Sequence, residues 1–413
     1  MTSGVVRVRL STPERRKRVL IFTIPNAGHL NVLKRMVGQY RDEYEFRLVL
    51  VDRTNTPPDV TDVGVPVVTP TACGRFINTP AGAVFARACD LLDECLALAR
   101  AFDPDLVMYD FCAVEGYFVG QVLGIRSWCS IPGLIGPLVD HGYLARSVSS
   151  ADNRAALAAI RDRYGVSVRP DQVELVSNSL FLPAELNLLW SYPAVTPANF
   201  TDNRHPARYR FVGYPVSGRP ARRGRCDRPL VYLSLGTEVM DNLWYGQRDT
   251  RDGVRRCVAG LAERWASWDV EVVFAAMDRP VLARYPANWR VYAAVDQQDI
   301  LSRADVFVTH GGSNSLHEAV VLQVPMVVAP FFGDQLLIGR RVRELGIGIA
   351  LAVPEGTDKD TPKDHLNDGL AERMDEAVRE ILADDRYRRS YAAVPLDSTP
   401  PLAELDVTVR RDG

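Results

Sequence analysis

The sequence has no apolar run long enough to cross a lipid bilayer and no large excess of charge of either sign. Its longest apolar stretches, such as 325–332, are far shorter than the roughly 20 residues that a membrane-spanning helix needs. Lysine and arginine number 49 against 51 aspartates and glutamates, a formal net charge of −2, and both signs are spread along the chain. The sequence therefore indicates no membrane span, no nucleic-acid partner and no anionic membrane surface, and it favours a small-molecule partner.

Closely spaced cysteine pairs and a secretory signal are also missing. The seven cysteines show no pairing at short intervals, and their number is odd. This pattern favours reduced thiols, and we expect a cytoplasmic protein. Segment 1–19 is rich in arginine but lacks an apolar stretch of about 7–15 residues before a small-residue cleavage site, so we expect a loose leader instead of a signal for secretion.

Short apolar strands alternate with helical segments, which predicts two doubly wound α/β domains with parallel sheets. A chain of 413 residues is about right for two domains of roughly 150–200 residues each. The expected strands are 18–25, 46–51, 106–109, 230–235, 271–275, 289–295, 306–309 and 326–329, with a helix over 83–102. The expected boundaries are 1–217 for the first domain, 218–228 for a linker rich in proline, glycine and arginine, 229–375 for the second domain, and 376–413 for C-terminal helices and a tail. Ligands of such domains bind at the carboxyl ends of the strands.

A glycine-rich turn follows the expected strand 306–309 and opens a helix. Its residues are His310, Gly311, Gly312, Ser313, Asn314 and Ser315. The first amides of a helix and its dipole bind anions, and two glycines let the backbone approach a diphosphate closely. Taken alone, the segment from Ser315 to Glu318 is equally well a capping box, in which serine and glutamate satisfy each other's backbone amides. The later strand 325–332 ends in Gly333-Asp334-Gln335 at the same sheet edge, which favours the ligand site.

These segments together resemble the donor-binding signature of family-1 glycosyltransferases, the UDP-glycosyltransferase-like enzymes of the GT-B fold, and especially their bacterial macrolide and natural-product branch. The matching residues run from His310 to Ala319 and continue through Val324-Pro325, Ala329-Pro330, Gly333-Asp334-Gln335 and Gly346-Ile347-Gly348. The resemblance implies two Rossmann-like domains that face a central cleft, with a C-terminal helix that returns to the first domain. It also implies transfer of a sugar from a nucleoside-diphosphate sugar, such as UDP-glucose or a dTDP-sugar, with no cofactor.

The resemblance divides the donor site among these residues. It assigns the diphosphate to His310 and the segment Gly311, Gly312, Ser313, Asn314 and Ser315, the ribose hydroxyls to Glu318, and the sugar hydroxyls to Asp334 and Gln335. Further phosphate contacts would come from Ser234, Gly236 and Thr237, although a tight turn that needs glycine explains these three as well. Val295 and Gln297 would lie beside the base. The family usually has Trp and Pro ahead of that glutamine, whereas Ala294 and Asp296 stand here, so stacking of the base on tryptophan is not implied.

Two residues of the first domain carry the implied chemistry. His29 follows the first strand in the segment Gly28-His29-Leu30-Asn31, and the resemblance makes it the catalytic base; Asp110, at the end of strand 106–109, would orient it. Without the resemblance, His29 is more often structural and Asp110 equally often a helix cap. A base at this position removes the acceptor proton, and a single displacement inverts the anomeric centre. Asp103-Pro104-Asp105 has the form of a metal-binding motif, but its proline favours a turn, and we expect no metal.

Two other functions remain open on the same architecture: a sugar-nucleotide epimerase, and a non-catalytic partner protein that binds a nucleotide sugar. A nicotinamide oxidoreductase is disfavoured because no G-x-G-x-x-G segment opens either domain.

The acceptor would be a hydrophobic natural product bound by the segments 68–86 and 131–197. The aromatic residues there that could line its pocket, or equally be ordinary core, are Phe76, Phe85, Tyr143, Trp190 and Tyr192. The sequence leaves open whether the chain forms a homodimer.

Overall fold

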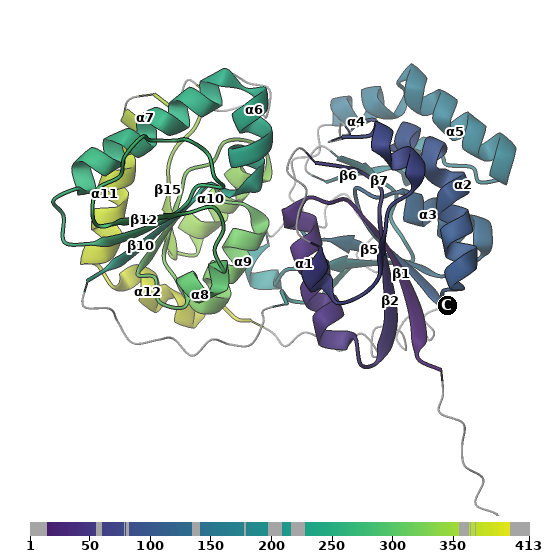
Figure 1. The fold of residues 1–413 in the computed structure, drawn as a ribbon, viewed down its shortest axis with the longest axis horizontal. Helices are drawn as coiled ribbons and strands as arrows, with labels where there is room; N and C mark the ends of the chain where they lie inside the picture. The colour runs from purple at the N-terminus through teal and green to yellow at the C-terminus, as the bar shows by residue number, and fades with distance from the viewer. Residues whose placement is uncertain are drawn as a thin grey trace, which may run out of the picture.

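The computed structural model of the chain forms two lobes side by side, each built on its own sheet (Figure 1). It describes residues 15–54, 60–77, 79, 82–133, 141–176, 179–196, 209–215, 228–354, 363, 365–367 and 369–396. The described residues from 15 to 215 make up the first lobe, and those from 228 to 396 make up the second. The fold class predicted from the sequence, two parallel α/β domains, is confirmed.

The first lobe contains a parallel sheet with the strand order β3-β2-β1-β4-β5-β8-β9. These strands are β1 (Lys17–Thr23), β2 (Tyr44–Leu50), β3 (Val67–Val68), β4 (Leu106–Asp110), β5 (Ser127–Ile131), β8 (Leu186–Leu189) and β9 (Tyr209–Phe211), and a separate hairpin pairs β6 (Glu174–Val176) with β7 (Ser179–Phe181). The helices are α1 (Ala27–Tyr40), α2 (Val84–Phe102), α3 (Glu115–Leu123), α4 (His141–Val148) and α5 (Ala151–Tyr164). β1 lies in the interior of this sheet, where it pairs with β2 and β4.

The second lobe repeats this arrangement with the strand order β12-β11-β10-β13-β14-β15. Its strands are β10 (Leu230–Ser234), β11 (Glu271–Ala275), β12 (Trp289–Tyr292), β13 (Val306–Thr309), β14 (Met326–Val328) and β15 (Gly348–Ala350). Its helices are α6 (Trp244–Gly246), α7 (Arg248–Trp265), α8 (Gln297–Leu301), α9 (Ser313–Leu322), α10 (Asp334–Glu344), α11 (Gly369–Ala383) and α12 (Arg386–Arg389), and a π-helical turn, Glu238–Leu243, follows β10.

Alternation along the central strands explains why both faces of each sheet are covered. On β1, Val19 and Ile21 belong to the same apolar cluster as Leu30 and Leu33 of α1, whereas Leu20 and Phe22 belong to the cluster of α2 and α3. Successive side chains of a strand point to opposite faces, so a continuous apolar run buries both. The cluster that contains α1 continues into the second lobe through Leu316 and Val320 of α9, so the lobes share apolar packing where α1 and α9 meet.

Several expected boundaries change. The sequence pattern after the first strand predicts a helix from near Asn31, whereas α1 begins at Ala27 because the Asn26 side chain caps it by accepting a hydrogen bond from the Gly28 amide at 2.9 Å. The expected domain boundary at 375 cuts α11, a continuous helix that packs on α7 in the second lobe and therefore belongs to it. The expected linker 218–228, except for Arg228, lies outside the described residues.

The C-terminal helices pack on the second lobe as far as the description reaches. The Tyr391 hydroxyl donates to the Val324 carbonyl at 2.6 Å, and Leu396 is the last described residue. The implied return of a C-terminal helix to the first domain therefore stays a prediction. No helix among the described residues combines the length and apolarity of a membrane span.

Candidate functional site

A cleft of about 1150 Å³ lies where the carboxyl ends of the two sheets face each other. β1 and β4 of the first lobe and β10 and β13 of the second all end at it, as parallel α/β sheets place their ligands. All the candidate site residues named from the sequence line this cleft, except Asp110 and Gly311. The two lobes therefore bring together residues as distant in the chain as His29 and Gln335.

His29 and Asp110 form a buried pair on the first-lobe side. His29 lies in the first turn of α1, and its Nδ1 is 2.9 Å from both carboxylate oxygens of Asp110, the last residue of β4. The Asp110 side chain is fully buried, and one fifth of the His29 side chain is exposed. The carboxylate fixes the proton on Nδ1, which leaves Nε2 as the acceptor nitrogen. Asp110 also accepts a hydrogen bond from the Cys112 amide at 2.9 Å, but the N-cap of the next helix, α3, is Val114, so the alternative role of Asp110 as a helix cap is wrong.

Acidic groups from both lobes control the charge of this imidazole. Burial lowers the pKa of His29, whereas the carboxylates of Asp110, Glu238 and Asp334 raise it. The carboxylates together outweigh burial, so the pKa lies above the ordinary 6.5. Burial raises the pKa of Asp334 to about 6 against the opposing effect of His29. Asp110 has the largest of these three effects, and Glu238 and Asp334 belong to the second lobe, so both lobes contribute to the basicity of His29.

Two glycines enclose the His310 imidazole in the second lobe. A Cβ at Gly236, whose φ is +73°, would lie 2.2 Å from the ring, and a Cβ at Gly312 would lie 2.5 Å from its Nε2. Burial lowers the pKa of His310 to about 4, so the ring is neutral at physiological pH. The turn at Gly236 thus needs glycine for its backbone and also makes room for His310.

Gly311 does not line the cleft, contrary to its expected place in the diphosphate segment. Its φ is +87°, and a Cβ there would lie 2.7 Å from Cγ1 of Val328 in the neighbouring strand. Close packing of the turn on β14 therefore places this glycine beneath the site, where it shapes the loop that presents Gly312.

The amino-terminal end of α9 is open to the cleft. Its N-cap residue, Gly312, makes no side-chain hydrogen bond, and no acidic residue lies in the first turn. Ser315 lies inside the helix, and the carboxylate of Glu318 is directed to other partners, so the alternative of a capping box is wrong. The first amides of α9 are therefore available to an anion.

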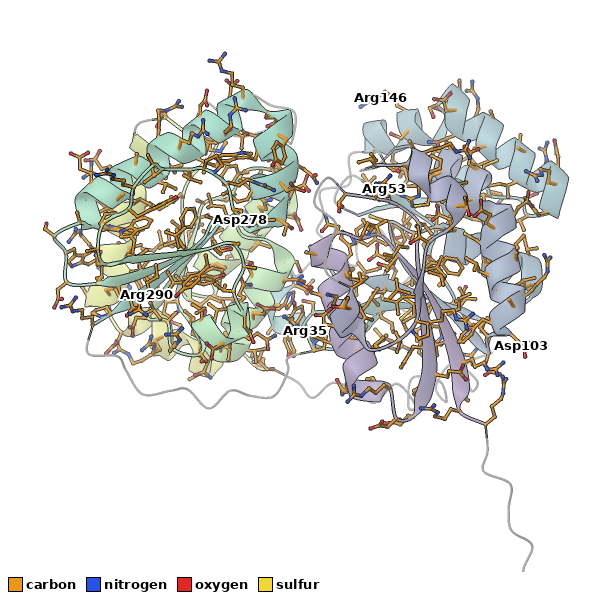
Figure 2. All side chains as sticks on the ribbon, viewed as in Figure 1. Arg35, Arg53, Asp103, Arg146, Asp278 and Arg290 are labelled. Carbon is orange, nitrogen blue, oxygen red and sulfur yellow. The ribbon has the colours of Figure 1, made fainter. Side chains whose placement is uncertain are left out.

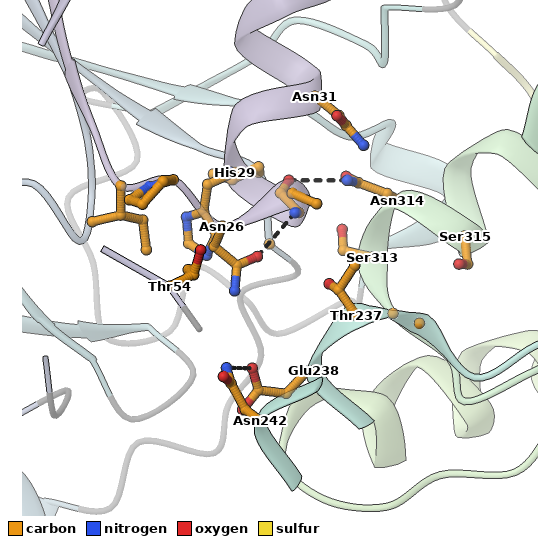
Figure 3. A pocket seen from close by; sticks show the side chains of 18 of the residues that line it. Asn26, His29, Asn31, Thr54, Thr237, Glu238, Asn242, Ser313, Asn314 and Ser315 are labelled. Atoms are coloured by element: carbon orange, nitrogen blue, oxygen red, sulfur yellow. Dashed lines mark hydrogen bonds between the residues drawn. The ribbon is translucent and has the colours of Figure 1, made fainter. Parts of the chain in front are cut away.

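Asn314 bridges the two lobes instead of lying free for a phosphate. Its amide nitrogen donates to the Gly28 carbonyl of α1 at 2.9 Å (Figure 3). His317 makes a second bridge, since its Nε2 is 2.8 Å from the Ser191 hydroxyl and its Nδ1 donates to the Ser313 carbonyl at 2.7 Å. The helix that faces the expected diphosphate is thus docked directly beside His29.

Glu318 and Gln297 contact each other. The Gln297 amide donates to one Glu318 oxygen at 2.7 Å, and its own oxygen accepts from the Tyr232 hydroxyl at 3.1 Å. Both ends of this side chain are engaged by protein groups, and each keeps one further hydrogen-bonding position for the expected contact with a base. The other Glu318 oxygen pairs with Arg35 of the first lobe at 2.5 Å.

Asp334 and Gln335 begin α10 at the cleft, after Gly333 with φ +59°. The Gln335 oxygen accepts from the amides of Phe331 at 2.8 Å and Phe332 at 3.3 Å, so this side chain braces the loop. Asp334 is the residue of the pair whose carboxylate is left to meet a ligand hydroxyl.

The sequence analysis missed several residues that line the cleft. Those with polar or aromatic side chains include Asn26, Arg35, Thr54, Phe111, Glu238 and Asn242. Figure 3 shows Glu238 and Asn242 on the turn after Thr237, joined by a hydrogen bond of 2.6 Å, and Thr54 on the opposite side. Glu238 directly follows the predicted segment 234–237, so extending that segment by one residue would have found it.

The expected acceptor aromatics are core residues instead. Phe85, Trp190 and Tyr192 are buried in the apolar clusters, and Phe76 packs against one of them. The Tyr143 side chain lies outside the described residues. None of these four rings is among the residues that line the cleft.

The Asp103-Pro104-Asp105 segment is a turn remote from the cleft (Figure 2 shows Asp103 at the far edge of the first lobe). Asp103 ends α2 with a φ of 53°, and Asp105 accepts a hydrogen bond from the Arg18 amide at 2.7 Å. Among the described residues, metal-ligating atoms gather at His29, Asp110 and Cys112, within 4.8 Å of one another. Burial, with Asp110 beside it, raises the pKa of the Cys112 thiol well above its ordinary value, which makes it a poor ligand.

Comparison with known proteins agrees with this geometry. Residues 260–398 match the family model described as erythromycin biosynthesis protein CIII-like, C-terminal domain. The NDP-glycosyltransferase YjiC of Bacillus licheniformis is 26% identical over 371 residues, which cover 83% of this chain and 86% of that protein.

Solved structures share the fold over almost the whole chain. The glycotransferase of kitacinnamycin superposes with a TM-score of 0.69 at 24% identity and covers 96% of this chain and 99% of its own. The spinosyn rhamnosyltransferase SpnG complexed with thymidine diphosphate superposes with a TM-score of 0.66 at 20% identity, over 95% of this chain and 100% of its own. The chain therefore shares the two-domain fold of these glycosyltransferases, and its second lobe resembles the C-terminal domain of the erythromycin biosynthesis protein CIII-like family.

Proposed function

We propose that this chain is an inverting, metal-independent glycosyltransferase that moves a sugar from a nucleoside-diphosphate sugar to a hydroxyl of a small hydrophobic natural product. The observation that carries the proposal is the position of the His29–Asp110 pair, which faces the uncapped start of α9 across one cleft. A base and an anion site on opposite walls are what a single displacement at an anomeric carbon between them requires.

In the proposed mechanism His29 acts as the base. Its Nε2 takes the proton of the acceptor hydroxyl while the oxygen forms a bond to the anomeric carbon. The bond from that carbon to the diphosphate oxygen breaks, and its electron pair leaves with the nucleoside diphosphate. Asp110 stabilises the imidazolium that forms, and the proton then passes to solvent. A positioned base of this kind contributes a factor of about 10²–10⁴ to the rate.

The leaving diphosphate would gather charge at the start of α9, where the amides of Ser313 and Asn314 begin the helix. The neutral His310 beside it can donate a hydrogen bond without adding a positive charge. The diphosphate would then need no metal to neutralise its charge, because the amides and the dipole of α9 supply positive charge. The complex of the related rhamnosyltransferase with thymidine diphosphate supports a dTDP-sugar, and Asp334 supports a donor with free sugar hydroxyls such as UDP-glucose.

The first-lobe wall of the cleft supports an apolar acceptor. Ile24, Val84, Phe111 and Pro132 line it around His29, and the Phe111 ring lies 5.2 Å from the imidazole between centroids. Charged residues such as Asp52, Arg53 and Arg87 line the same wall, and apolar side chains among a few placed polar groups are typical of sites that orient a hydrophobic ligand. We place the enzyme in the cytoplasm, since the six described cysteines are free thiols, and a homodimer stays a prediction.

Binding of nucleotides tests the donor part of the proposal. UDP or dTDP should raise the melting temperature of the protein by mass action, whereas the nucleosides without phosphate should not. A protein stabilised by no nucleoside diphosphate would remove the proposed function. Two further assays separate the other two functions. Incubation with donor sugar alone would give an epimerised sugar if the protein were an epimerase. Binding of the donor without transfer to any of a broad set of acceptors would support a non-catalytic partner.

A further inference from the structure

The carboxylate of Glu318 is held by donors from both lobes. Arg35 donates to Oε1 at 2.5 Å, the Tyr214 hydroxyl donates to the same oxygen at 3.4 Å, and Gln297 donates to Oε2 at 2.7 Å. Only 3% of the Glu318 side chain is exposed. A carboxylate accepts about four hydrogen bonds, so these contacts leave about one position, on Oε2, for a ligand.

Arg35 is itself fixed. It donates to the Tyr214 hydroxyl at 2.8 Å, and its guanidinium lies 5.4 Å from the centre of the Tyr214 ring. The Tyr214 ring in turn stacks on His317 of α9 at 5.0 Å and 9°. Burial lowers the pKa of Arg35, but Tyr214 and Glu318 raise it above its ordinary value, so the guanidinium keeps its charge. Figure 2 shows Arg35 where the two lobes meet.

Two contacts align α1 with α9. Gly28 and Arg35 lie two turns apart on α1 and meet Asn314 and Glu318, which lie one turn apart on α9. His29 stands next to the first of these contacts. A shift of the Arg35–Glu318 pair therefore moves the helix that carries the base relative to the helix that faces the donor.

We propose that Arg35 is a positioning residue that holds Glu318 with its remaining Oε2 position toward a ribose hydroxyl of the nucleotide. This inference rests on the proposed function, because it assumes that a nucleotide occupies the cleft. In this role Arg35 acts on the nucleotide through Glu318 and not by direct contact. Without the Arg35 guanidinium, the buried carboxylate of Glu318 would turn toward solvent or take up a proton.

The test compares a nucleotide with its analogue that lacks the ribose hydroxyls. The probes are UDP and 2′,3′-dideoxy-UDP, or dTDP and 3′-deoxy-dTDP if the wild type prefers thymine, and the measurement is the Kd by calorimetry. Wild type should bind the hydroxylated nucleotide more tightly. In Arg35→Met we expect that preference to fall about tenfold, since a hydrogen bond to a charged group is lost, with the Kd of the deoxy analogue nearly unchanged. Arg35→Lys, which keeps the charge, should recover part of the preference.

Two further variants show that the effect passes through Glu318. Glu318→Gln should abolish the preference, and adding Arg35→Met to it should change nothing more, because both act on one contact. Arg341→Met is the matched control: Arg341 also bridges the lobes, by donating to the Ala194 carbonyl at 2.7 Å, but does not contact Glu318. It should leave the preference unchanged even if it lowers stability.

The outcomes separate the two proposals. A wild type that binds no nucleoside diphosphate overturns the proposed function. A wild type that prefers the hydroxylated nucleotide, with an equal preference in folded Arg35→Met, overturns the role of Arg35 and leaves the donor site standing. Equal losses of preference in Arg35→Met and Arg341→Met would also overturn it, since docking of the lobes would then be the cause.

Discussion

Substitution of Gly236 by alanine should disturb His310 through direct steric contact. Gly236 has a φ of +73°, and a Cβ there would lie 2.2 Å from Cε1 of the His310 ring and 2.6 Å from Nε2. A left-handed backbone costs an alanine about 1–2 kcal/mol, and overpacking adds about 1–3 kcal/mol. We therefore expect Gly236→Ala to lower the free energy of unfolding by about 2–5 kcal/mol, measured by chemical denaturation.

Gly165 provides the matched control for the backbone contribution. Its φ is +75°, and a Cβ there would meet nothing within 4 Å. Gly165→Ala should therefore show the backbone cost alone, about 1–2 kcal/mol. The double variant Gly236→Ala, His310→Ala should recover most of the remaining difference relative to His310→Ala, because the atom that clashes has been removed. Equal destabilisation by Gly236→Ala and Gly165→Ala would refute the steric reasoning.

Four further predictions concern the reaction. His29→Ala should lower kcat about 10²–10⁴-fold with an unchanged nucleotide Kd; a simultaneous loss of nucleotide binding would argue against its role as a base. The pKa of His29 is raised and the base must be neutral, so kcat should increase with pH through a midpoint above 6.5, and Glu238→Gln should move that midpoint down; an unmoved midpoint would contradict the coupling. Phe111→Leu should raise KM for apolar acceptors but not for donor, with a changed donor KM counting against an acceptor wall. A chelator should leave turnover intact, and loss restored by a divalent cation would show a metal requirement.

Most strands of the second lobe could be predicted to within a few residues, but β15 (Gly348–Ala350) was not predicted. Segments 271–275 and 306–309 coincide with β11 and β13, because each is an apolar run bounded by polar residues. β5 (Ser127–Ile131) and β8 (Leu186–Leu189) were not predicted, since they are short and contain serine or asparagine. They are strands because the neighbouring strands and the apolar clusters bury them, which is a tertiary effect.

The site was predictable where a residue sits at the end of its own strand, and unpredictable where the two lobes meet. His29 and Asp110 lie together because β1 and β4 are neighbours, an order that the sequence indicates only through the family resemblance. The contacts of Asn314 with Gly28 and of Glu318 with Arg35 depend on how α1 docks on α9, and no local pattern specifies that. The same docking explains why Glu318, expected to face the nucleotide, is held by Arg35 and Tyr214, whereas Gln297 is held within its own lobe by Tyr232 and Glu318.

The stereochemistry of transfer tests the central claim most directly. UDP-α-glucose and dTDP-α-glucose would be incubated with a set of apolar phenols and macrolide alcohols, and the anomeric proton of any product would be examined by NMR. The account predicts a β-linked product from wild type, no detectable product from His29→Ala in the same time, and normal activity from Gly165→Ala, which lies away from the cleft. An α-linked product, or equal turnover by His29→Ala, would contradict it.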